Sequence, residues 1–479
     1  MPSGILRSGA APAPTHMLLI AVVLVGAAFA LSQGITTVSL RYALVVVSAL
    51  VLFGVAFVRT DFGIYLVIFS MLLSPEFVAG PSGESQRAAI TLRTEDLTLI
   101  VIGLSWFAKT AVNKEMGLVT KTPLNRPIMA YVLASLFATL VGYVTGTVRT
   151  QSGFFYVLKY VEYFFVYYMV VNNVTDRRQA WRLVTAAFVT AAIVSLLGAA
   201  QVPSGERVSA PFEGEVGEPN TFGGYLLLMM AIAGGIAFET RRLRMRFRML
   251  ALLALMLVPF VFTLSRASYL GLIPAFFALL WLSDRRRLAA GLVLVAVVLS
   301  PVVIAILPKP VVKRVLYTFE PERGQPTVRL GRVGLDPSTS ARLLSVEDAL
   351  KGWIRRPILG YGVTGFRFMD AQYARTLVET GVVGMAAFVW LMWSVIRSAR
   401  AAFKRLDDPE ERGLVLGFMA GTVGLLVHAI GSNTFIIVRI MEPFWFFAGI
   451  VVMLPVVADR GARREPPPVA ARRPLPRPA

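Results

Sequence analysis

The chain has 479 residues, of which 56% are hydrophobic and 16% are charged, and its mean hydropathy is +0.67. Soluble domains carry about 25% charged residues, so this composition excludes soluble multidomain enzymes, disordered proteins and fibrous proteins and indicates a membrane protein. The net charge of +20 does not indicate a nucleic-acid partner, because the basic residues are scattered between apolar runs. With no cysteine and two histidines, thiolate chemistry is excluded, and we expect no cofactor and no metal.

Apolar runs of about 17–25 residues can cross the hydrocarbon layer as helices. In chain order, the candidate runs are 17–33, 39–58, 62–79, 95–112, 126–146, 153–174, 180–201, 221–239, 248–265, 267–283, 288–307, 376–397, 412–432 and 435–457. We therefore predict an all-α polytopic membrane protein with about 12–14 transmembrane helices. The first run ends in Ala28-Phe29-Ala30, which resembles a signal-peptidase site. Because the run continues past Ala30, we expect a retained anchor.

Lysine and arginine set the orientation of such a protein, because they are retained on the cytoplasmic side. The basic clusters are Lys109 to Arg126, Arg177 to Arg182, Arg241 to Arg248, Arg285 to Arg287, Arg397 to Arg412, and the arginines from Arg460 to Arg477. With the predicted spans, all of these clusters fall on one side. We therefore expect a bacterial inner-membrane protein with both termini in the cytoplasm.

This topology leaves one long polar segment, 308–375, on the periplasmic side. The predicted organisation is a cytoplasmic N-terminus at 1–16, spans within 17–307, the periplasmic loop 308–375, three spans within 376–457 and a disordered basic, proline-rich cytoplasmic tail at 458–479. Within the loop, Asp336 to Ser340 predict the start of a helix that Pro357 ends. A second helix is predicted to begin at Asp370 and to continue into the next span.

The long loop is rich in lysine and arginine although topology does not demand basic residues on that side. Such an excess favours an anionic ligand, with phosphate as the leading candidate, because arginine binds it through two parallel hydrogen bonds. A solvated basic surface near anionic lipid headgroups is the alternative. The charge pattern alone leaves both interpretations open.

Four groups of residues resemble the O-antigen ligase and O-antigen polymerase (Wzy-like) superfamily of bacterial membrane glycosyltransferases. They are Leu158 to Tyr163 with Val171-Asn172-Asn173; Phe212 to Tyr225; Thr263 to Ser268; and Arg342, Trp353, Pro357, Leu359 to Gly362 and Leu377 to Gly381. Together they extend over roughly 155–457. The order of these motifs and the position of the long loop carry the resemblance.

The resemblance implies a helical, GT-C-like fold and a metal-independent transferase. Members of the superfamily take a glycan linked through pyrophosphate to undecaprenol and transfer it on the periplasmic face. The implied partners are this undecaprenyl-pyrophosphate-linked oligosaccharide and membrane lipid, and a chain-length regulator or an export machinery is a further candidate. A ligase transfers the glycan to lipid A-core, whereas a polymerase transfers it to another lipid-linked repeat unit.

One departure from the family pattern concerns the end of the long loop. Ligases commonly carry a His-Asn pair there, whereas this chain has Asp370 to Arg375 without a histidine. The histidines are His16 and His428, neither of which lies in the loop. The sequence therefore favours a polymerase for O-antigen or exopolysaccharide, with a ligase as the alternative. A non-enzymatic transporter or flippase is a second alternative.

Three residues are predicted to carry the reaction. Fixed cations would stabilise the leaving pyrophosphate, and Arg266 and Arg342 are the candidates. A carboxylate would take the proton of the acceptor hydroxyl, and Asp370 is the candidate by its position, with Glu379 as the competitor. An interfacial anchor for Arg266 and a solvated surface position for Arg342 are the alternatives.

Further side chains are candidates for binding substrate. They are Arg207, Glu215, Glu218, Asn220, Lys159, Glu162, Tyr361, Gln372, Tyr373 and Glu379. Arg207 either binds phosphate or pairs with the acidic run that follows it. Lys159 and Glu162 share one helix face, where they either neutralise each other or line the site. The two tyrosines either stack on sugars or anchor the protein at the membrane interface.

Overall fold

The computed structural model describes residues 40–79, 90–112, 121–149, 152–212, 217–322, 324–325 and 327–464. The chain forms two compact units, Met1–Thr120 and Lys121–Ala479. The predicted first span, 17–33, and His16 lie outside the described residues.

The described residues of the first unit form three helices and one short antiparallel pair of strands. Its elements are α2 (Leu40–Val58), α3 (Thr60–Leu73), β1 (Glu76–Ala79), β2 (Ile90–Arg93) and α4 (Thr94–Val112). The predicted span 62–79 was too long at its end. Ser74 has extended backbone angles and precedes Pro75, so α3 ends at Leu73 and the next residues form β1.

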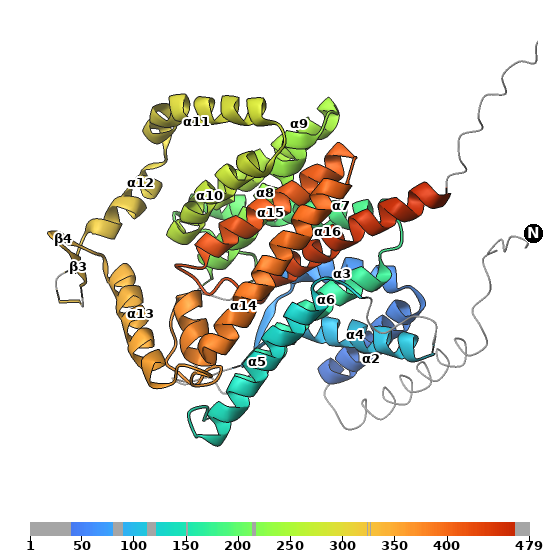
Figure 1. Ribbon diagram of the computed structural model, residues 1–479, viewed down its shortest axis with the longest axis horizontal. Coiled ribbons are helices and arrows are strands. Elements are labelled where there is room, and N and C mark those ends of the chain that lie inside the picture. Colours follow the sequence, from blue (N-terminus) through green and yellow to red (C-terminus); the bar gives the residue numbers. More distant parts are fainter. Residues whose placement is uncertain are drawn as a thin grey trace, which may run out of the picture. The chain divides into compact units, whose positions relative to one another are not determined.

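The second unit is a helical bundle that carries the long loop (Figure 1). Its bundle helices are α5 (Asn125–Val144), α6 (Ser152–Asn173), α7 (Arg177–Gln201), α8 (Pro219–Glu239), α9 (Leu243–Phe262), α10 (Arg266–Leu282), α11 (Arg286–Ile306), α14 (Gln372–Arg405), α15 (Pro409–His428) and α16 (Val438–Arg464). The loop contains α12 (Lys309–Leu316), η3 (Tyr317–Phe319), β3 (Arg329–Leu330), β4 (Val333–Gly334) and α13 (Pro337–Arg355), and η2 (Val202–Ser204) follows α7.

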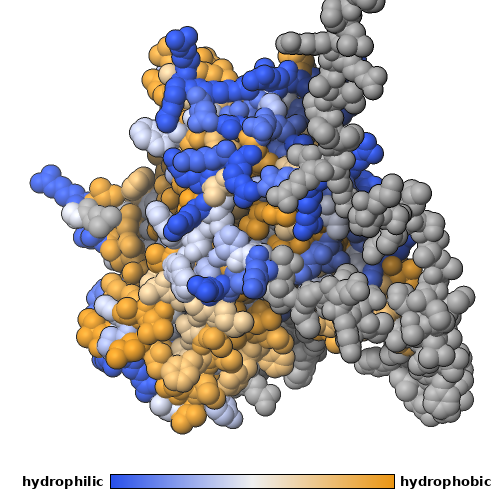
Figure 2. Space-filling model, turned by 45° about the vertical axis from the view of Figure 1, so that its right-hand side comes forward, coloured by the Kyte–Doolittle hydropathy of each residue, from blue (hydrophilic) through white to orange (hydrophobic). Residues whose placement is uncertain are grey.

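The all-α polytopic membrane fold is confirmed. In the described part of the chain, a helix coincides with each predicted span, and seven helices are long and apolar enough to cross a membrane, with three shorter apolar helices besides. Large apolar side chains such as Phe137, Leu196 and Val298 are exposed. Figure 2 shows hydrophobic side chains over wide areas of the surface, as expected where lipid is the solvent.

The centre of the second unit is the contact between α8 and α15. Gly235 on α8 faces Gly413 and Gly417 on α15, and a Cβ on Gly235 would lie 2.3 Å from the carbonyl oxygen of Gly413. Small residues let two membrane helices approach this closely. The close contact makes α8 almost entirely buried, so α8 and α15 form a fixed base for the residues at their ends.

Four of the basic clusters meet at one end of this unit. Their ion pairs are Arg177 with Glu411, Arg242 with Glu410, Arg285 with Glu239, and Arg412 with Asp284. The starts of α7 and α15 and the ends of α8 and α10 therefore lie together. The starts of α8, α10 and α14 and the end of α15 lie at the opposite end, where the long loop returns.

The structure corrects two predicted boundaries in the C-terminal part. The second helix of the loop was predicted to begin at Asp370 and to continue into the next span. Instead, α14 begins at Gln372, and it reaches the span through a break at Gly381, where φ is 64°. The last helix, α16, continues through residues 458–464, which were predicted to belong to the tail. The remainder of the predicted tail lies outside the described residues.

The break at Gly381 fastens the long loop to the bundle. The Val382 amide donates to the Pro357 carbonyl at 2.9 Å, and the amides of Tyr361 and Gly362 donate to the carbonyls of Val378 and Glu379 at 3.0 and 2.8 Å. A Cβ at position 381 would lie 2.1 Å from the carbonyl oxygen of Ile358. A glycine is therefore required, both for the positive φ and for this close approach.

Replacing Gly381 with alanine should destabilise the protein. The positive φ costs roughly 1–2 kcal/mol for a residue with a Cβ, and the approach of the Ile358 carbonyl adds to this cost. We expect the melting temperature of the detergent-purified protein to fall by roughly 4 °C or more. Gly291→Ala is the matched control, because no atom lies within 4 Å of a Cβ at that position of α11. Equal melting temperatures for the two variants would contradict the assigned role of Gly381.

Candidate functional site

Helix α13 is the core of the long loop, and Asp336 caps its N-terminus. The Asp336 carboxylate accepts hydrogen bonds from the amides of Ser338 and Thr339, which confirms the helix start predicted there. Ala349 of α13 packs against Met369 and Val378 in a small hydrophobic cluster. This packing sets α13 against the first turns of α14.

Arg266 at the start of α10 joins the loop to the bundle. Its two terminal nitrogens bind both oxygens of Asp336, at 2.7 and 3.2 Å, and Nη1 also donates to the Thr318 hydroxyl at 2.9 Å. The Asp336 side chain is fully buried. Burial alone would raise the pKa of this carboxyl, but the hydrogen bonds from Arg266 and Thr339 hold it below its ordinary value.

Arg207 lies beside the turn between α9 and α10. Its Nε donates to the Thr263 carbonyl at 3.0 Å, and its Nη2 lies 3.4 Å from the Leu264 carbonyl and 3.5 Å from Asn220 Oδ1. Burial, together with the positive charges of Arg314, Arg266 and Arg342, lowers the pKa of Arg207 to about 10. It therefore stays charged at neutral pH and shares one region with three other guanidinium groups.

Arg314 on α12 is the member of this group that the sequence analysis did not single out. Burial and the neighbouring Arg266 lower its pKa, partly offset by Asp336. In the described ranges the structure gives Arg314 no ion pair, and its Nε is buried without a hydrogen-bond acceptor. The amphipathic sequence Lys309 to Leu316 is consistent with a surface helix, so no sequence signal distinguished Arg314 from its basic neighbours.

Arg342 and Asp370, which are far apart in the sequence, are brought together. Arg342 Nη2 lies 3.5 Å from Asp370 Oδ2, and 40% of the Asp370 side chain is exposed. The Nε of Arg342 is also buried without an acceptor among the described residues. The other Asp370 oxygen accepts a 3.3 Å hydrogen bond from Asn433, which the sequence analysis also missed.

We call Arg207, Arg266, Arg314, Arg342, Asp336 and Asp370 the arginine cluster. Four positive and two negative charges leave it with a net charge of +2. A buried donor without an acceptor costs about 1–3 kcal/mol, and Arg314 and Arg342 each contribute one. The cluster is therefore suited to bind a dianion that supplies acceptors to both residues.

Several other predicted site residues are occupied by contacts within the protein. Lys159 and Glu162 pair with each other at 3.0 Å within α6. The Tyr361 ring contacts Phe366 and lies 5.0 Å from the Arg356 guanidinium, while the Tyr373 hydroxyl donates to the Leu426 carbonyl. These contacts favour packing roles for the two tyrosines.

Glu379, the competitor of Asp370, is buried. Its Oε1 accepts hydrogen bonds from the Thr364 amide and from Arg375 Nε, both at 3.1 Å. Gln372, also buried, accepts from the Phe435 amide at 3.0 Å. Glu379 and Gln372 therefore both hold segments of backbone in place. Of the two candidate bases, Asp370 is partly exposed and Glu379 is buried.

The acidic run before α8 is only partly described. Glu218 precedes the first residue of α8 and accepts a 2.7 Å hydrogen bond from the Thr221 hydroxyl. Asn220 contacts Arg207, as described above. Glu215 lies outside the described residues.

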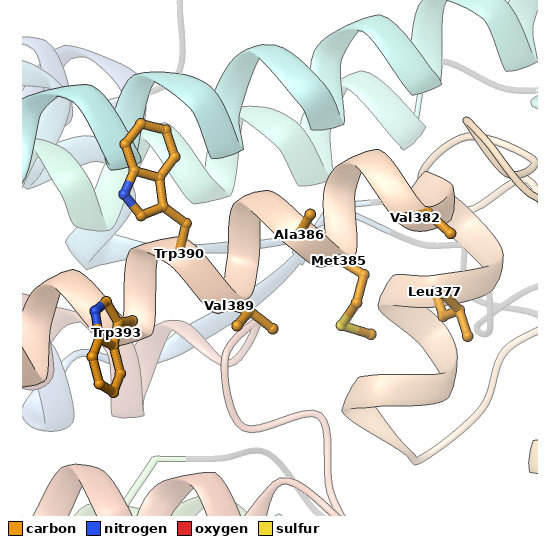
Figure 3. Close-up of a pocket in the computed structure, with 7 residues that line it drawn as sticks. All are labelled: Leu377, Val382, Met385, Ala386, Val389, Trp390 and Trp393. Carbon is orange, nitrogen blue, oxygen red and sulfur yellow. The ribbon is translucent and has the colours of Figure 1, made fainter.

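An apolar groove of about 460 Å³ lies on α14 (Figure 3). Its lining residues are Leu377, Val382, Met385, Ala386, Val389, Trp390 and Trp393. The groove has no charged side chain, so it offers no group that could take up a proton or bind phosphate. The chemistry of the site therefore belongs to the arginine cluster.

The described residues contain no group of three or more His, Asp or Glu side chains that could hold a metal ion.

Residues 251–389 match the family model described as O-antigen ligase (Wzy_C). This match confirms the resemblance to the O-antigen ligase and polymerase superfamily, and it includes Arg266, Arg314, Arg342 and Asp370. No curated protein matches the chain.

Replacing Asp336 with asparagine should release α13 from the bundle. The variant leaves Arg266 without its counter-ion, and breaking a largely buried pair in this way costs roughly 3 kcal/mol. We expect amides in 337–355 to exchange with deuterium roughly 100-fold faster. Asp348→Asn is the control, because Asp348 pairs with Arg367 at an exposed position of the same helix. Equal exchange in both variants would contradict the role of the Arg266–Asp336 pair.

The same pair predicts a pH dependence of the loop. The folded-state pKa of Asp336 lies below its ordinary value of 3.8, so its stabilising contribution is complete above that value. The contribution is lost as the pH falls through the folded-state pKa. The protection of the amides in 337–355, taken relative to their intrinsic exchange rates at each pH, should therefore fall below about pH 3.8 in the natural protein, and Asp336→Asn should remove this pH dependence of the protection. A pH dependence that persists in the variant would assign it to another group.

Proposed function

We propose that the protein is a polysaccharide polymerase that transfers a glycan from a polyprenyl-pyrophosphate donor to another lipid-linked repeat unit. The match to the O-antigen ligase family supports transfer activity of this general type. The observation that carries the proposal is the arginine cluster, whose net charge of +2 is complementary to a pyrophosphate diester with two negative charges. The cluster lies where the long loop meets α10 and α14.

In the proposed reaction, an acceptor hydroxyl oxygen attacks the anomeric carbon of the donor glycan. The bond between that carbon and the phosphate oxygen breaks, and polyprenyl pyrophosphate leaves with the bonding electrons. Arg314 and Arg342 would stabilise the negative charge that develops on the leaving oxygen. Arg266 and Arg207 have most of their donors engaged by Asp336 and by backbone carbonyls, so they would contribute charge and hold the site together.

Asp370 would take the proton from the acceptor hydroxyl. Its carboxylate is partly exposed and lies beside Arg342, so the base would stand next to the phosphate-binding cation. This arrangement fits the reaction, because the anomeric carbon lies one bond from the phosphate oxygen. Glu379 fits less well, because it is buried and already binds Thr364 and Arg375.

The acceptor distinguishes the polymerase from its alternative, the ligase. The polymerase is favoured because residues 308–375 contain no histidine, whereas the resemblance implies a His-Asn pair in ligases. For the location, we propose the inner membrane with the arginine cluster on the periplasmic side. The four paired basic clusters at the opposite end of the second unit support this orientation.

Replacing either of the two arginines whose Nε lacks an acceptor, Arg314 or Arg342, should slow the reaction. Arg314→Ala and Arg342→Ala should each lower kcat by roughly 100-fold, the loss typical of removing one donor to a developing anion. The assay measures the release of polyprenyl pyrophosphate from purified protein and a lipid-linked repeat unit. Arg332→Ala is the control, because Arg332 is an exposed loop residue outside the cluster. Equal loss in all three variants would point to a general charge effect.

The same purified protein separates the two transferase functions. With the lipid-linked repeat unit alone, a polymerase should produce a ladder of glycans that differ by one repeat, and lipid A-core should not be required. Products that appear only when lipid A-core is added, and that carry the glycan on it, would establish the ligase. Donor that crosses a vesicle membrane without any bond exchange would instead support the flippase.

A further inference from the structure

The connection between α15 and α16, residues 429–437, is buried from Ser432 to Ile436 although it has no regular secondary structure over most of its length. Ser432, Asn433, Thr434 and Phe435 are each at most 5% exposed. Connecting segments usually run over the surface, because their backbone polar groups need partners. A buried connection therefore requires specific partners within the fold.

Two side chains supply partners to this connection from its ends. At the start of α14, the backbone N–H of Gln372 donates to the Ala429 carbonyl at 3.2 Å, and the side-chain Oε1 of Gln372 accepts from the Phe435 amide at 3.0 Å. His428 Nδ1 lies 2.7 Å from the Thr434 hydroxyl. These contacts fix the backbone on both sides of Asn433.

Asn433 in turn contacts the segment that carries Asp370. Its Nδ2 donates to the Met369 carbonyl at 2.7 Å and to Asp370 Oδ1 at 3.3 Å. Asp370 precedes α14, whose N-cap position is Ala371 and has no side-chain cap. Apart from Arg342 on the other carboxylate oxygen, Asn433 is thus the side chain that orients Asp370 among the described contacts.

The choice of an amide at this position carries a cost. Asn433 Oδ1 is buried without a hydrogen-bond donor among the described residues, and a buried acceptor without a donor is destabilising. An apolar residue would avoid that cost but could not donate to Asp370. An acidic residue would repel Asp370, and a lysine would neutralise it. An asparagine donates a hydrogen bond while it leaves the charge of Asp370 unchanged.

We propose that Asn433 is a positioning residue that holds the Asp370 carboxylate in the orientation for proton transfer. The proposal rests on the proposed function, in which Asp370 is the base. Arg342 holds Oδ2 beside the pyrophosphate site, and Asn433 holds Oδ1 and the preceding carbonyl. The partly exposed carboxylate is then directed to one position, where the acceptor hydroxyl would stand.

The test is a double-mutant cycle on the purified full-length protein, measured as release of polyprenyl pyrophosphate. Asn433→Ala should lower kcat by about 30-fold, which is less than the loss of roughly 100-fold or more expected when a general base is removed. The KM for the donor should be nearly unchanged. In an Asp370→Asn background, Asn433→Ala should cause no further loss, because its effect passes through Asp370. Asn173→Ala is the matched control, since Asn173 Nδ2 donates within its own helix α6, to the Met169 carbonyl at 2.8 Å.

A second variant distinguishes loss of the hydrogen bond to Asp370 from loss of the fold. Asn433→Leu has a similar shape but no polar atom that could donate to Asp370, so it should be as slow as Asn433→Ala while it elutes as a single species in gel filtration. An unchanged kcat for Asn433→Ala, or a further loss in the Asp370→Asn background, would overturn the inference. Failure of both variants to fold would also overturn it, because Asn433 would then be purely structural.

The cycle also separates this inference from the proposed function. If Asp370→Asn and Arg342→Ala both retained full activity, the proposed base and phosphate contact would be wrong, and the inference would fail with them. If those two variants lost activity while Asn433→Ala did not, the proposed function would stand and the positioning role alone would be rejected.

Discussion

The ion pair between Arg266 and Asp336 is the constraint on which the site depends. One end of the pair is the first residue of a bundle helix, and the other is the cap of the loop helix α13. Because the carboxylate is fully buried and bound through both oxygens, the loop has a fixed position on the bundle. Arg314 and Arg342, which flank Asp336 in the sequence, are thereby held beside Arg207. A long polar segment thus contributes two cations and, through Asp370, a carboxylate to one place.

Elements that depend on local sequence could be predicted. The spans follow from runs of apolar residues, since a membrane helix must satisfy its backbone hydrogen bonds internally. The start of α13 follows from Asp336, whose side chain accepts hydrogen bonds from the next amides. The ends of the helices were predicted less accurately. Helix α3 ends at Leu73 before Pro75, earlier than predicted, and α16 continues to Arg464, later than predicted. Apolarity does not mark where a helix ends outside the hydrocarbon layer.

Features that depend on contacts between distant residues could not be predicted. The break of α14 at Gly381 is imposed by the Ile358 carbonyl, which comes from the preceding loop. Arg314 belongs to the cluster because α12 lies near Arg266, and neither its neighbours nor its spacing indicate this. Asn433 reaches Asp370 across 63 positions of sequence. Arg266 was predicted to stabilise the leaving pyrophosphate, whereas in the structure its terminal nitrogens bind Asp336 and Thr318 of the loop.

The most direct measurement of the central claim is equilibrium binding of three lipids that share one polyprenyl chain and end in a pyrophosphate, a monophosphate or an alcohol. If the arginine cluster binds a dianionic pyrophosphate, the purified protein should bind the pyrophosphate most tightly. Arg314→Ala should reduce that preference by about tenfold or more, as expected for the loss of a charge-assisted contact. Equal affinity for all three lipids, or a preference unchanged by Arg314→Ala, would contradict the account.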